Sequence, residues 1–279
     1  MQIVVIVIIA AVVLAFLAMN PGRGRPEEMR AFMRRPVAHR GLHDNKGEAP
    51  ENSMAAYRLA VQRGYGIELD VRETKDGQLV TVHDRNLKRV AGCDRCVEDL
   101  TLDEIKALKL FGSEERIPHF ADVLAMVGGR VPIVMEIKGD TLDMALQTSE
   151  KAARLLDSYA GKSSVCMESF HPAAVWWYRK HRPEMLRGQL SERFQGFGPR
   201  MSAALVPVSF LMTNFLTRPD FIAYNLRHRG LLRFRIQRHL FHAVCAAWTV
   251  RSQKQMDEAA DDFDIFIFEG FEPREDGHA

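Results

Sequence analysis

Hydrophobic residues form one long run near the amino terminus and a series of short runs along the rest of the chain. Residues 3–19 are all apolar and carry no charge. Seventeen helical residues rise about 25 Å, which is the short end of the length that crosses the hydrocarbon core of a bilayer. The pattern therefore predicts a transmembrane anchor over residues 1–20.

A secretory signal peptide is the alternative interpretation of this run. Such a peptide has a basic start and a small-residue cleavage site, but Met1 and Gln2 carry no side-chain charge and residues 15–18 fit a cleavage site poorly. We therefore favour an uncleaved anchor. Five arginines follow the run within residues 23–35, and the positive-inside rule then predicts a single-pass membrane protein with its catalytic domain in the cytoplasm.

Short apolar runs alternate with longer segments of helical pattern after residue 36. We predict nine strands, at residues 37–41, 66–71, 79–84, 131–138, 165–170, 187–190, 220–225, 246–250 and 264–269. Residues 72–78 are too few for a parallel crossover and contain the turn pair Asp76-Gly77, so the third strand should run antiparallel to the second. The other eight strands predict an α/β fold of the (β/α)₈ TIM barrel type.

Composition and charge limit the possible classes of protein. The barrel domain is predicted at residues 37–279, about 240 residues and near the usual size of one barrel, and residues 21–36 are predicted to form a basic juxtamembrane linker. The formal charge of +2 has its excess near the anchor, where arginines suit anionic lipids, so we expect no nucleic-acid partner. Cys93 and Cys96 have the spacing of a zinc or redox half-site but lack a second ligand pair, which favours free thiols.

Two segments are unusual for barrel connections. Residues 205–216 are nearly all apolar, and residues 227–242 interleave five arginines with apolar residues. One interpretation is outer barrel packing with a solvated basic face, and the other is a surface that lies against the bilayer. On the second interpretation, replacing these arginines with glutamine should weaken binding to anionic vesicles.

Ionisable residues gather at the expected carboxyl ends of the strands, where a barrel builds its active site. In chain order they are His39, Arg40, Glu68, Asp70, His83, Glu136 and Lys138. Glu68 and Asp70 face the same side of their strand and can share a hard divalent cation. Glu136 and Lys138 repeat this spacing after an apolar run, where an inward charged pair needs a metal or phosphate as partner. With two histidines as acid and base, the set predicts metal-assisted chemistry on a phosphate ester.

Eight short motifs follow one another between Val37 and the carboxyl end. They are His39-Arg40-Gly41, Pro50-Glu51-Asn52-Ser53, Ile67-Glu68-Leu69-Asp70-Val71, Thr74-Lys75-Asp76-Gly77, Val82-His83-Asp84, Glu136-Ile137-Lys138, Ser169-Phe170 and Trp248-Thr249-Val250. In this order they resemble the glycerophosphodiester phosphodiesterase family, in its membrane-anchored bacterial form. The resemblance implies a phospholipase C-like barrel that releases glycerol 3-phosphate from glycerophosphodiesters.

The resemblance also implies roles for single residues. The ligands of one Ca²⁺ or Mg²⁺ ion would be Glu68, Asp70 and Glu136. The substrate and its phosphate would be bound by Arg40, Lys138 and Trp248. His39 and His83 would exchange the roles of base and acid while a glycerol hydroxyl attacks phosphorus and water opens the resulting cyclic phosphate. Which histidine acts first as the base stays open, as does a contact of His83 with the metal.

Several assignments keep an alternative. Glu51 is either an acid that supports the site or a charge in the first turn of a helix, which Asn52 or Ser53 would cap. The chain also departs from the family pattern: Arg251 stands where asparagine is usual, and Glu269 follows Phe268 where a Thr-Asp pair is common. We expect altered substrate contacts there and an intact metal site.

Three functions follow from these observations. The first is hydrolysis of soluble glycerophosphodiesters, and the second is the same chemistry on a lysophospholipid or another membrane diester, in the manner of a lysophospholipase D. The third is a catalytically silent barrel that acts as a membrane-bound binding module. The third is poorly supported, because every ionisable residue of the expected site is present.

Overall fold

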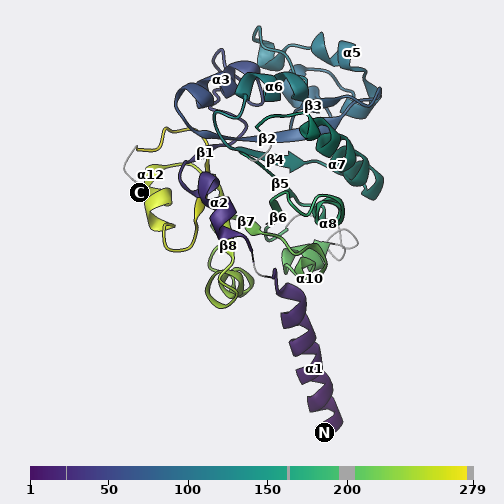
Figure 1. Ribbon diagram of the computed structural model, residues 1–279, viewed down its shortest axis with the longest axis vertical. Helices are drawn as coiled ribbons and strands as arrows, with labels where there is room; N and C mark the ends of the chain where they lie inside the picture. Colours follow the sequence, from purple (N-terminus) through teal and green to yellow (C-terminus); the bar gives the residue numbers. More distant parts are fainter. Residues whose placement is uncertain (23, 162–163, 195–204, 275–279) are drawn as a thin grey trace.

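Eight parallel strands close a barrel in the computed structural model, which describes residues 1–22, 24–161, 164–194 and 205–274 (Figure 1). The barrel strands are β1 (Val37–Ala38), β2 (Gly66–Glu73), β4 (Ile133–Ile137), β5 (Val165–Ser169), β6 (Arg187–Ser191), β7 (Phe221–Asn225), β8 (Val244–Val250) and β9 (Ile265–Phe268). The first strand pairs with both β2 and β9, which closes the barrel. The predicted (β/α)₈ fold is confirmed, with all nine predicted strands in place.

The remaining strand, β3 (Leu79–Thr81), returns antiparallel along the end of β2, as predicted. A tight turn joins the two strands: the Thr74 amide donates to the Gln78 carbonyl at 2.9 Å, and Gly77 has a φ of +77°, a left-handed value that glycine adopts without strain. Just after β3, the amide of Val82 donates to the Asp70 carbonyl at 3.0 Å. The hairpin therefore returns the chain to the level of the carboxylates on β2.

Helices cover the outside of the barrel. They include α3 (Met54–Gln62), α6 (Phe120–Val127), α7 (Leu142–Asp157), α8 (Pro172–His181) and α12 (Gln253–Glu258). Their large apolar side chains, such as Tyr57, Phe120 and Tyr178, are fully buried against the outward residues of the strands. The helices described around β7 are shorter: α10 (Asn214–Thr217), η4 (Leu226–His228), α11 (Leu232–Arg235) and the π-helical turn η5 (Ile236–Leu240).

The chain between β3 and α6 forms a small layer of its own. It contains α4 (Lys88–Ala91), η1 (Val97–Asp99), α5 (Leu102–Lys106) and η2 (Leu110–Gly112). Nine buried apolar residues of this region, from Val80 to Ile117, make a separate cluster. This layer supports the hairpin from outside and lies at the end of the molecule opposite α1 (Figure 1).

The amino-terminal end of the barrel is closed by α2 (Pro26–Met33). Its Met29 and Phe32 are fully buried among inward residues of the strands, such as Val37 and Phe221. Full burial of an apolar side chain of this size is worth about 1.5–3 kcal/mol. Part of the predicted linker at residues 21–36 is therefore packed into the barrel. The arginines of this segment suggested a basic linker, so the apolar face of the helix was not predicted from the sequence.

The long amino-terminal helix α1 (Gln2–Met19) projects away from the barrel beside α10 (Figure 1). Among the described residues it is the one helix that could span a membrane, judged by length and composition. Its last residue is held firmly: the Met19 carbonyl accepts hydrogen bonds from Asn214 Nδ2 at 3.0 Å and from Gln237 Nε2 at 2.9 Å. Both amide side chains are fully buried. The carboxyl end of α1 is thus part of the folded domain.

Candidate active site

The turn after β1 carries His39 and Arg40 to the carboxyl end of the barrel. Arg40 has a φ of +56°, and in this conformation its backbone amide donates to Glu68 Oε2 at 3.0 Å. Gly41 follows with a φ of +82°, and a Cβ there would lie 2.9 Å from the Ala56 carbonyl carbon. The His-Arg-Gly motif therefore bends the chain sharply against α3 and anchors the bend on one of the site's carboxylates.

Glu68 and Asp70 on β2 and Glu136 on β4 form the centre of the site. Each offers a carboxylate oxygen within 4.8 Å of the others, and the three residues are 0–7 % exposed. Their closeness follows from the sheet register, which places Asp70 opposite Glu136. Burial, Asp70 and Glu136 raise the pKa of Glu68 well above its ordinary value. A cation at this position would relieve that repulsion.

Lys138 lies between two of these acids. Its Nζ is 2.9 Å from Asp70 Oδ1 and 2.7 Å from Glu136 Oε1. Burial opposes the charge on Asp70, but Lys138, His83 and Arg40 together hold the pKa of this carboxyl well below its usual range. The ammonium group therefore lies between the carboxylates of Asp70 and Glu136.

His39 bridges the carboxylates and the end of β9. Its Nε2 is 3.9 Å from Glu68 Oε2, and its Nδ1 is 2.6 Å from Glu269 Oε2. Burial lowers the pKa of His39, while the contact with Glu269 opposes this shift. The pKa of Glu269 is lowered to about 2, chiefly by its hydrogen bond with His39. A charged Glu269 accepts the Nδ1 proton, which leaves the Nε2 lone pair facing the site.

His83 reaches the same mouth from the hairpin. Its Nδ1 lies 2.8 Å from Asp84 Oδ1, and burial lowers the pKa of His83 to about 4. Asp84 is in turn paired with Arg89 at 2.6 Å. Both predicted catalytic histidines are therefore oriented by a carboxylate, and burial lowers the pKa of each.

Glu51 links the part of the site around His39 to the part around His83, because it binds Arg40 and Arg89. It accepts from Arg40 Nη1 at 2.8 Å and from Arg89 Nη2 at 2.6 Å. Although burial opposes ionisation, Arg89, Arg40 and Asn45 lower the pKa of Glu51 to about 2. Of the two interpretations of Glu51, the supporting acid agrees with the structure.

Asn52 and Ser53 were both candidates for the cap of α3, and the structure gives them different roles. Ser53 caps α3 by accepting from the Ala56 amide at 3.1 Å. Asn52 instead donates from Nδ2 to Asp70 Oδ2 at 2.8 Å and accepts from the Tyr57 hydroxyl at 2.7 Å. Asn52 is thus a buried residue that positions Asp70.

Glu168 on β5 is a fourth acid of the site that we did not predict. It lies opposite Glu136 in the sheet and is 2 % exposed. Its Oε2 has no hydrogen-bond partner among the described residues, and burial with Glu136 nearby raises its pKa well above the ordinary value. The sequence signal for Glu168 was a carboxylate within the apolar run of a predicted strand, but only the register between β4 and β5 places it beside Glu136.

Trp248 lies at the end of β8 and forms an apolar side of the mouth with Phe170. The two rings meet edge to face, 5.5 Å apart. The Trp248 Nε1 is buried and has no hydrogen-bond partner within the part of the chain that the structure describes. It is therefore a buried donor that the described residues leave unpaired.

A second possible metal group lies at the outer edge of the site. It consists of His39, His43 and Glu269, whose ligand atoms are also within 4.8 Å of one another. Here His39 and Glu269 are already paired, and Glu269 Oε1 is 3.2 Å from Arg251. The all-carboxylate group has the oxygen donors that Ca²⁺ and Mg²⁺ prefer, so it fits the expected cation better. His43, which the sequence gave us no reason to include, is half-buried beside His39 and Glu269.

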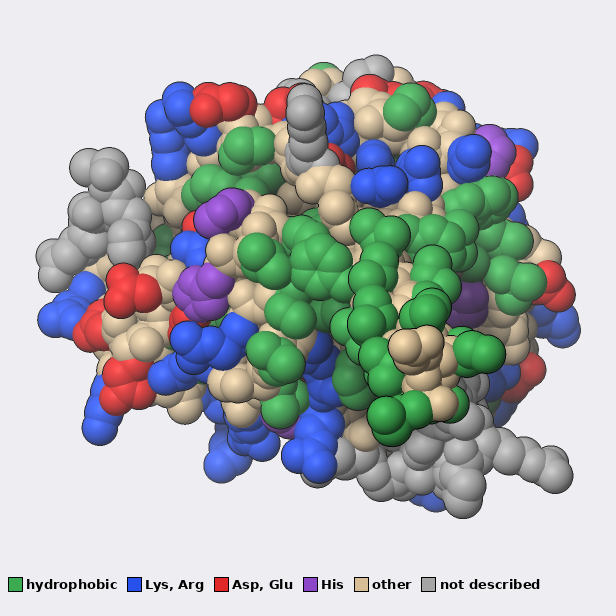
Figure 2. Space-filling view, turned by 90° about the horizontal axis from the view of Figure 1, so that it is seen from below, with side chains coloured by type: hydrophobic (Ala, Val, Ile, Leu, Met, Phe, Trp, Pro, Cys, Tyr) green, Lys and Arg blue, Asp and Glu red, His purple; other side chains and the backbone are tan. Residues whose placement is uncertain are grey.

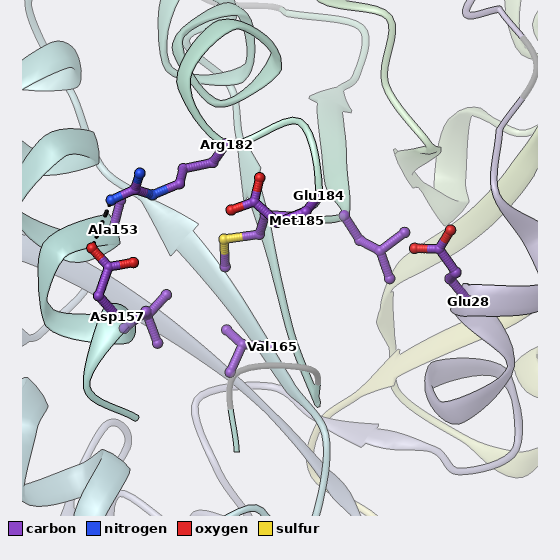
Figure 3. Close-up of a pocket in the computed structure, with 9 residues that line it drawn as sticks. Glu28, Ala153, Asp157, Val165, Arg182, Glu184 and Met185 are labelled. Carbon is purple, nitrogen blue, oxygen red and sulfur yellow. Dashed lines mark hydrogen bonds and ion pairs between the residues drawn. The ribbon is translucent and has the colours of Figure 1, made fainter. Parts of the chain in front are cut away.

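A cavity of about 430 Å³ opens at the other end of the barrel, between the carboxyl ends of α7 and α8 and the starts of β5 and β6 (Figure 3). Val165, Met185 and Glu28 line it, and Arg182 and Asp157 are paired at its edge at 2.7 Å. None of the predicted site residues lines this cavity. The predicted site residues lie at the opposite, carboxyl-terminal mouth.

Known proteins share both the sequence pattern and the fold. The chain is 37 % identical over 163 residues to a glycerophosphodiester phosphodiesterase of Caldanaerobacter subterraneus, a match that covers 55 % of this chain and 65 % of that protein. It is 36 % identical over 132 residues to lysophospholipase D GDPD1 of Rattus norvegicus, covering 43 % and 41 % of the two chains.

A phosphodiesterase from Oleispira antarctica, solved in complex with the product sn-glycerol-3-phosphate, has the same fold. The TM-score is 0.66 at 21 % identity, with 86 % of this chain and 94 % of that chain covered. The model of the glycerophosphoryl diester phosphodiesterase family matches residues 39–261, which contain every predicted site residue. The chain therefore belongs to the glycerophosphoryl diester phosphodiesterase family.

Proposed function

We propose that this protein hydrolyses glycerophosphodiesters to glycerol 3-phosphate and an alcohol. The observation that carries the proposal is the meeting of three buried carboxylates and two carboxylate-oriented histidines at one barrel mouth. Family membership and the names of the relatives support the same reaction.

We propose that Glu68, Asp70 and Glu136 hold one Ca²⁺ or Mg²⁺ ion. The three groups supply only oxygen donors, and their mutual repulsion favours a bound cation. When bound, the ion would hold the phosphoryl oxygens and offset the negative charge that develops in the transition state. Lys138 and Arg40 lie against the same acids and would pair with the phosphate as it enters.

The histidines form the acid and base pair of this proposal. One enters the step neutral and takes the proton of a glycerol hydroxyl while that oxygen attacks phosphorus, and the other enters it as the imidazolium and gives its Nε2 proton to the oxygen of the departing alcohol. The roles reverse when water opens the cyclic phosphate, so protons balance over the cycle. Glu269 and Asp84 hold the Nδ1 protons of His39 and His83, which directs each Nε2 to the substrate.

The test is glycerol 3-phosphate release from glycerophosphocholine by full-length protein in detergent, with and without Ca²⁺ or Mg²⁺. We expect metal-dependent release that His39→Ala abolishes and that His181→Ala, a matched change on the exposed end of α8, leaves intact. Equal release by the His39 and His181 variants would contradict the proposed roles. Absence of release from every phosphodiester substrate would favour the silent barrel.

A second candidate keeps the chemistry and changes the substrate to a lysophospholipid. Exposed apolar side chains near α1, among them Phe215 and Leu216, favour it, and one relative is named as a lysophospholipase D. The test compares the rate on lysophosphatidylcholine with the rate on glycerophosphocholine. Cleavage of the deacylated substrate alone would exclude the lipid function.

We also propose that α1 is retained as an anchor, with the barrel in the cytoplasm. The buried Asn214 and Gln237 both donate to Met19, and removal of α1 would leave their amide groups without this acceptor. The intact mass of protein extracted from membranes tests retention, and protease accessibility from each side of the membrane tests orientation. A mass that lacks α1 would support the signal peptide instead.

A further inference from the structure

The surface around the foot of α1 is apolar and basic. In the view from below, hydrophobic side chains gather around α1, and Lys and Arg side chains border this area (Figure 2). Its members include Phe215 and Leu216 on α10 and Leu240 on η5, which are 47 %, 48 % and 57 % exposed. We call these three side chains the foot patch.

The foot patch is joined to α1 by direct contacts. The ring of Phe16 on α1 lies 4.9 Å from the ring of Phe241, the residue that follows Leu240. The Met19 carbonyl binds Asn214, the first residue of α10, and Gln237 in η5. Both elements of the patch therefore contact the carboxyl end of α1, at the point where this helix leaves the domain.

Charge is segregated in the same part of the chain. Between Arg193 and Met256 the only acidic residue is Asp220. This residue is buried, and its carboxylate is 2.8 Å from Arg25 Nη2. Arg218 is exposed beside Gly22, just beyond α1. An anionic surface would therefore meet cations here and few opposing charges.

Three of the five arginines between residues 227 and 242 are engaged within the protein. Arg233 Nε donates to the Tyr224 hydroxyl at 3.0 Å. Arg229 lies 3.7 Å from Asp262, and Arg238 is 2.7 Å from Asp264. Arg227 and Arg235 are exposed. The first interpretation of this segment, as outer barrel packing, thus holds for part of it, and the exposed arginines are available to a partner.

We propose that the foot patch lies on the surface of an anionic bilayer, so that the barrel is docked on the membrane and not merely tethered to it. The occupant is assigned from continuity with the apolar α1 and from charge complementarity. Phe215, Leu216 and Leu240 enter the interfacial region, and Arg218 contacts lipid headgroups. This goes beyond the proposed hydrolysis, because it concerns a surface outside the catalytic mouth.

The experiment places a fluorescent label at single cysteines of the full-length protein, in a background with Cys93 and Cys96 replaced by serine. The labelled positions are Leu216→Cys, Leu240→Cys, Ile8→Cys on α1 and the control Leu59→Cys. Leu59 is 39 % exposed on α3, which lies at the end opposite α1. The protein is reconstituted into vesicles of phosphatidylcholine and phosphatidylglycerol, and quenching by nitroxide-labelled lipids is measured.

We expect quenching and blue-shifted emission at positions 8, 216 and 240, and neither change at 59. Labels at 216 and 240 that behave like the label at 59, while position 8 is quenched, would overturn docking and leave the anchor intact. An unquenched position 8 would overturn both. Equal quenching at 216 in vesicles of phosphatidylcholine alone would overturn the part assigned to Arg218. Each labelled variant must unfold at the same temperature as the parent protein, a control that holds whether or not the proposed hydrolysis is confirmed.

Discussion

Loss of the Glu269 carboxylate should slow the reaction by weakening the orientation and charge of His39. The two side chains meet at 2.6 Å, and the pKa of Glu269 falls from an ordinary 4.5 to about 2. A shift of this size corresponds to about 3 kcal/mol in total. Arg251 and His43 contribute part of it, so the share of His39 is smaller. We expect Glu269→Gln to lower kcat/KM about 10-fold to 100-fold.

The pH profile gives this prediction a second readout. Burial lowers the pKa of His39 and Glu269 raises it, so removal of the carboxylate must lower this pKa further. The acid limb of kcat/KM reports protonation of the histidine that acts as the base in the free enzyme. If His39 is that base, the limb moves to lower pH in Glu269→Gln. A slower enzyme with an unmoved limb would assign the base to His83.

The matched control is Glu272→Gln, three residues further along the chain. Glu272 is exposed and pairs with Arg63 at 2.8 Å, away from the catalytic histidines. Exposed pairs of this kind contribute about 0–1 kcal/mol, so rate and pH profile should stay near those of the parent protein. If Glu269→Gln has the same kinetics as this control, the proposed role of Glu269 is refuted.

Three further changes test other contacts. Asn52→Ala removes the bonds to Asp70 and Tyr57, and it should cost about 1–3 kcal/mol of unfolding free energy and much of the activity, as measured by denaturant titration and product release. The pKa of Glu168 is raised in the folded protein, so the folded state keeps a proton that the unfolded chain loses near pH 4.5, and the contribution of Glu168 to stability falls as pH rises above that value. In metal-free melts, the stability of Glu168→Gln relative to the parent protein should therefore be greater at pH 8 than at pH 5. Gln237→Ala should destabilise the domain by about 1–3 kcal/mol and increase protease cleavage near residue 20.

The strands and the main site could be predicted because their signals are local. Apolar runs of four to eight residues mark barrel strands, and a period of two places Glu68 and Asp70 on one face. The short Asp76-Gly77 turn forces an antiparallel return, which brings His83 to the mouth. Each inference needs only neighbours along the chain, and each of these placements is found in the structure.

Features that depend on packing between distant segments were missed. Glu168 joins the site only through the register of β4 and β5, and Asn52 reaches Asp70 only after the turn at Arg40 is built. The helix α2 closes the barrel because the open end of a barrel exposes apolar side chains, but the arginines in and around it suggested a linker. These contacts cannot be predicted from the positions of the residues in the sequence alone.

The two departures from the family pattern form one structural unit. Arg251 and Glu269 are 3.2 Å apart, and the second oxygen of Glu269 binds His39. We expected altered substrate contacts at this point; the contact found is with a proposed catalytic histidine. Glu269 meets the Nδ1 side of the ring and Glu68 the Nε2 side. The altered pair can therefore tune the basicity of His39 without a change in the three carboxylates, and Arg251 offsets the charge of the acid that does so.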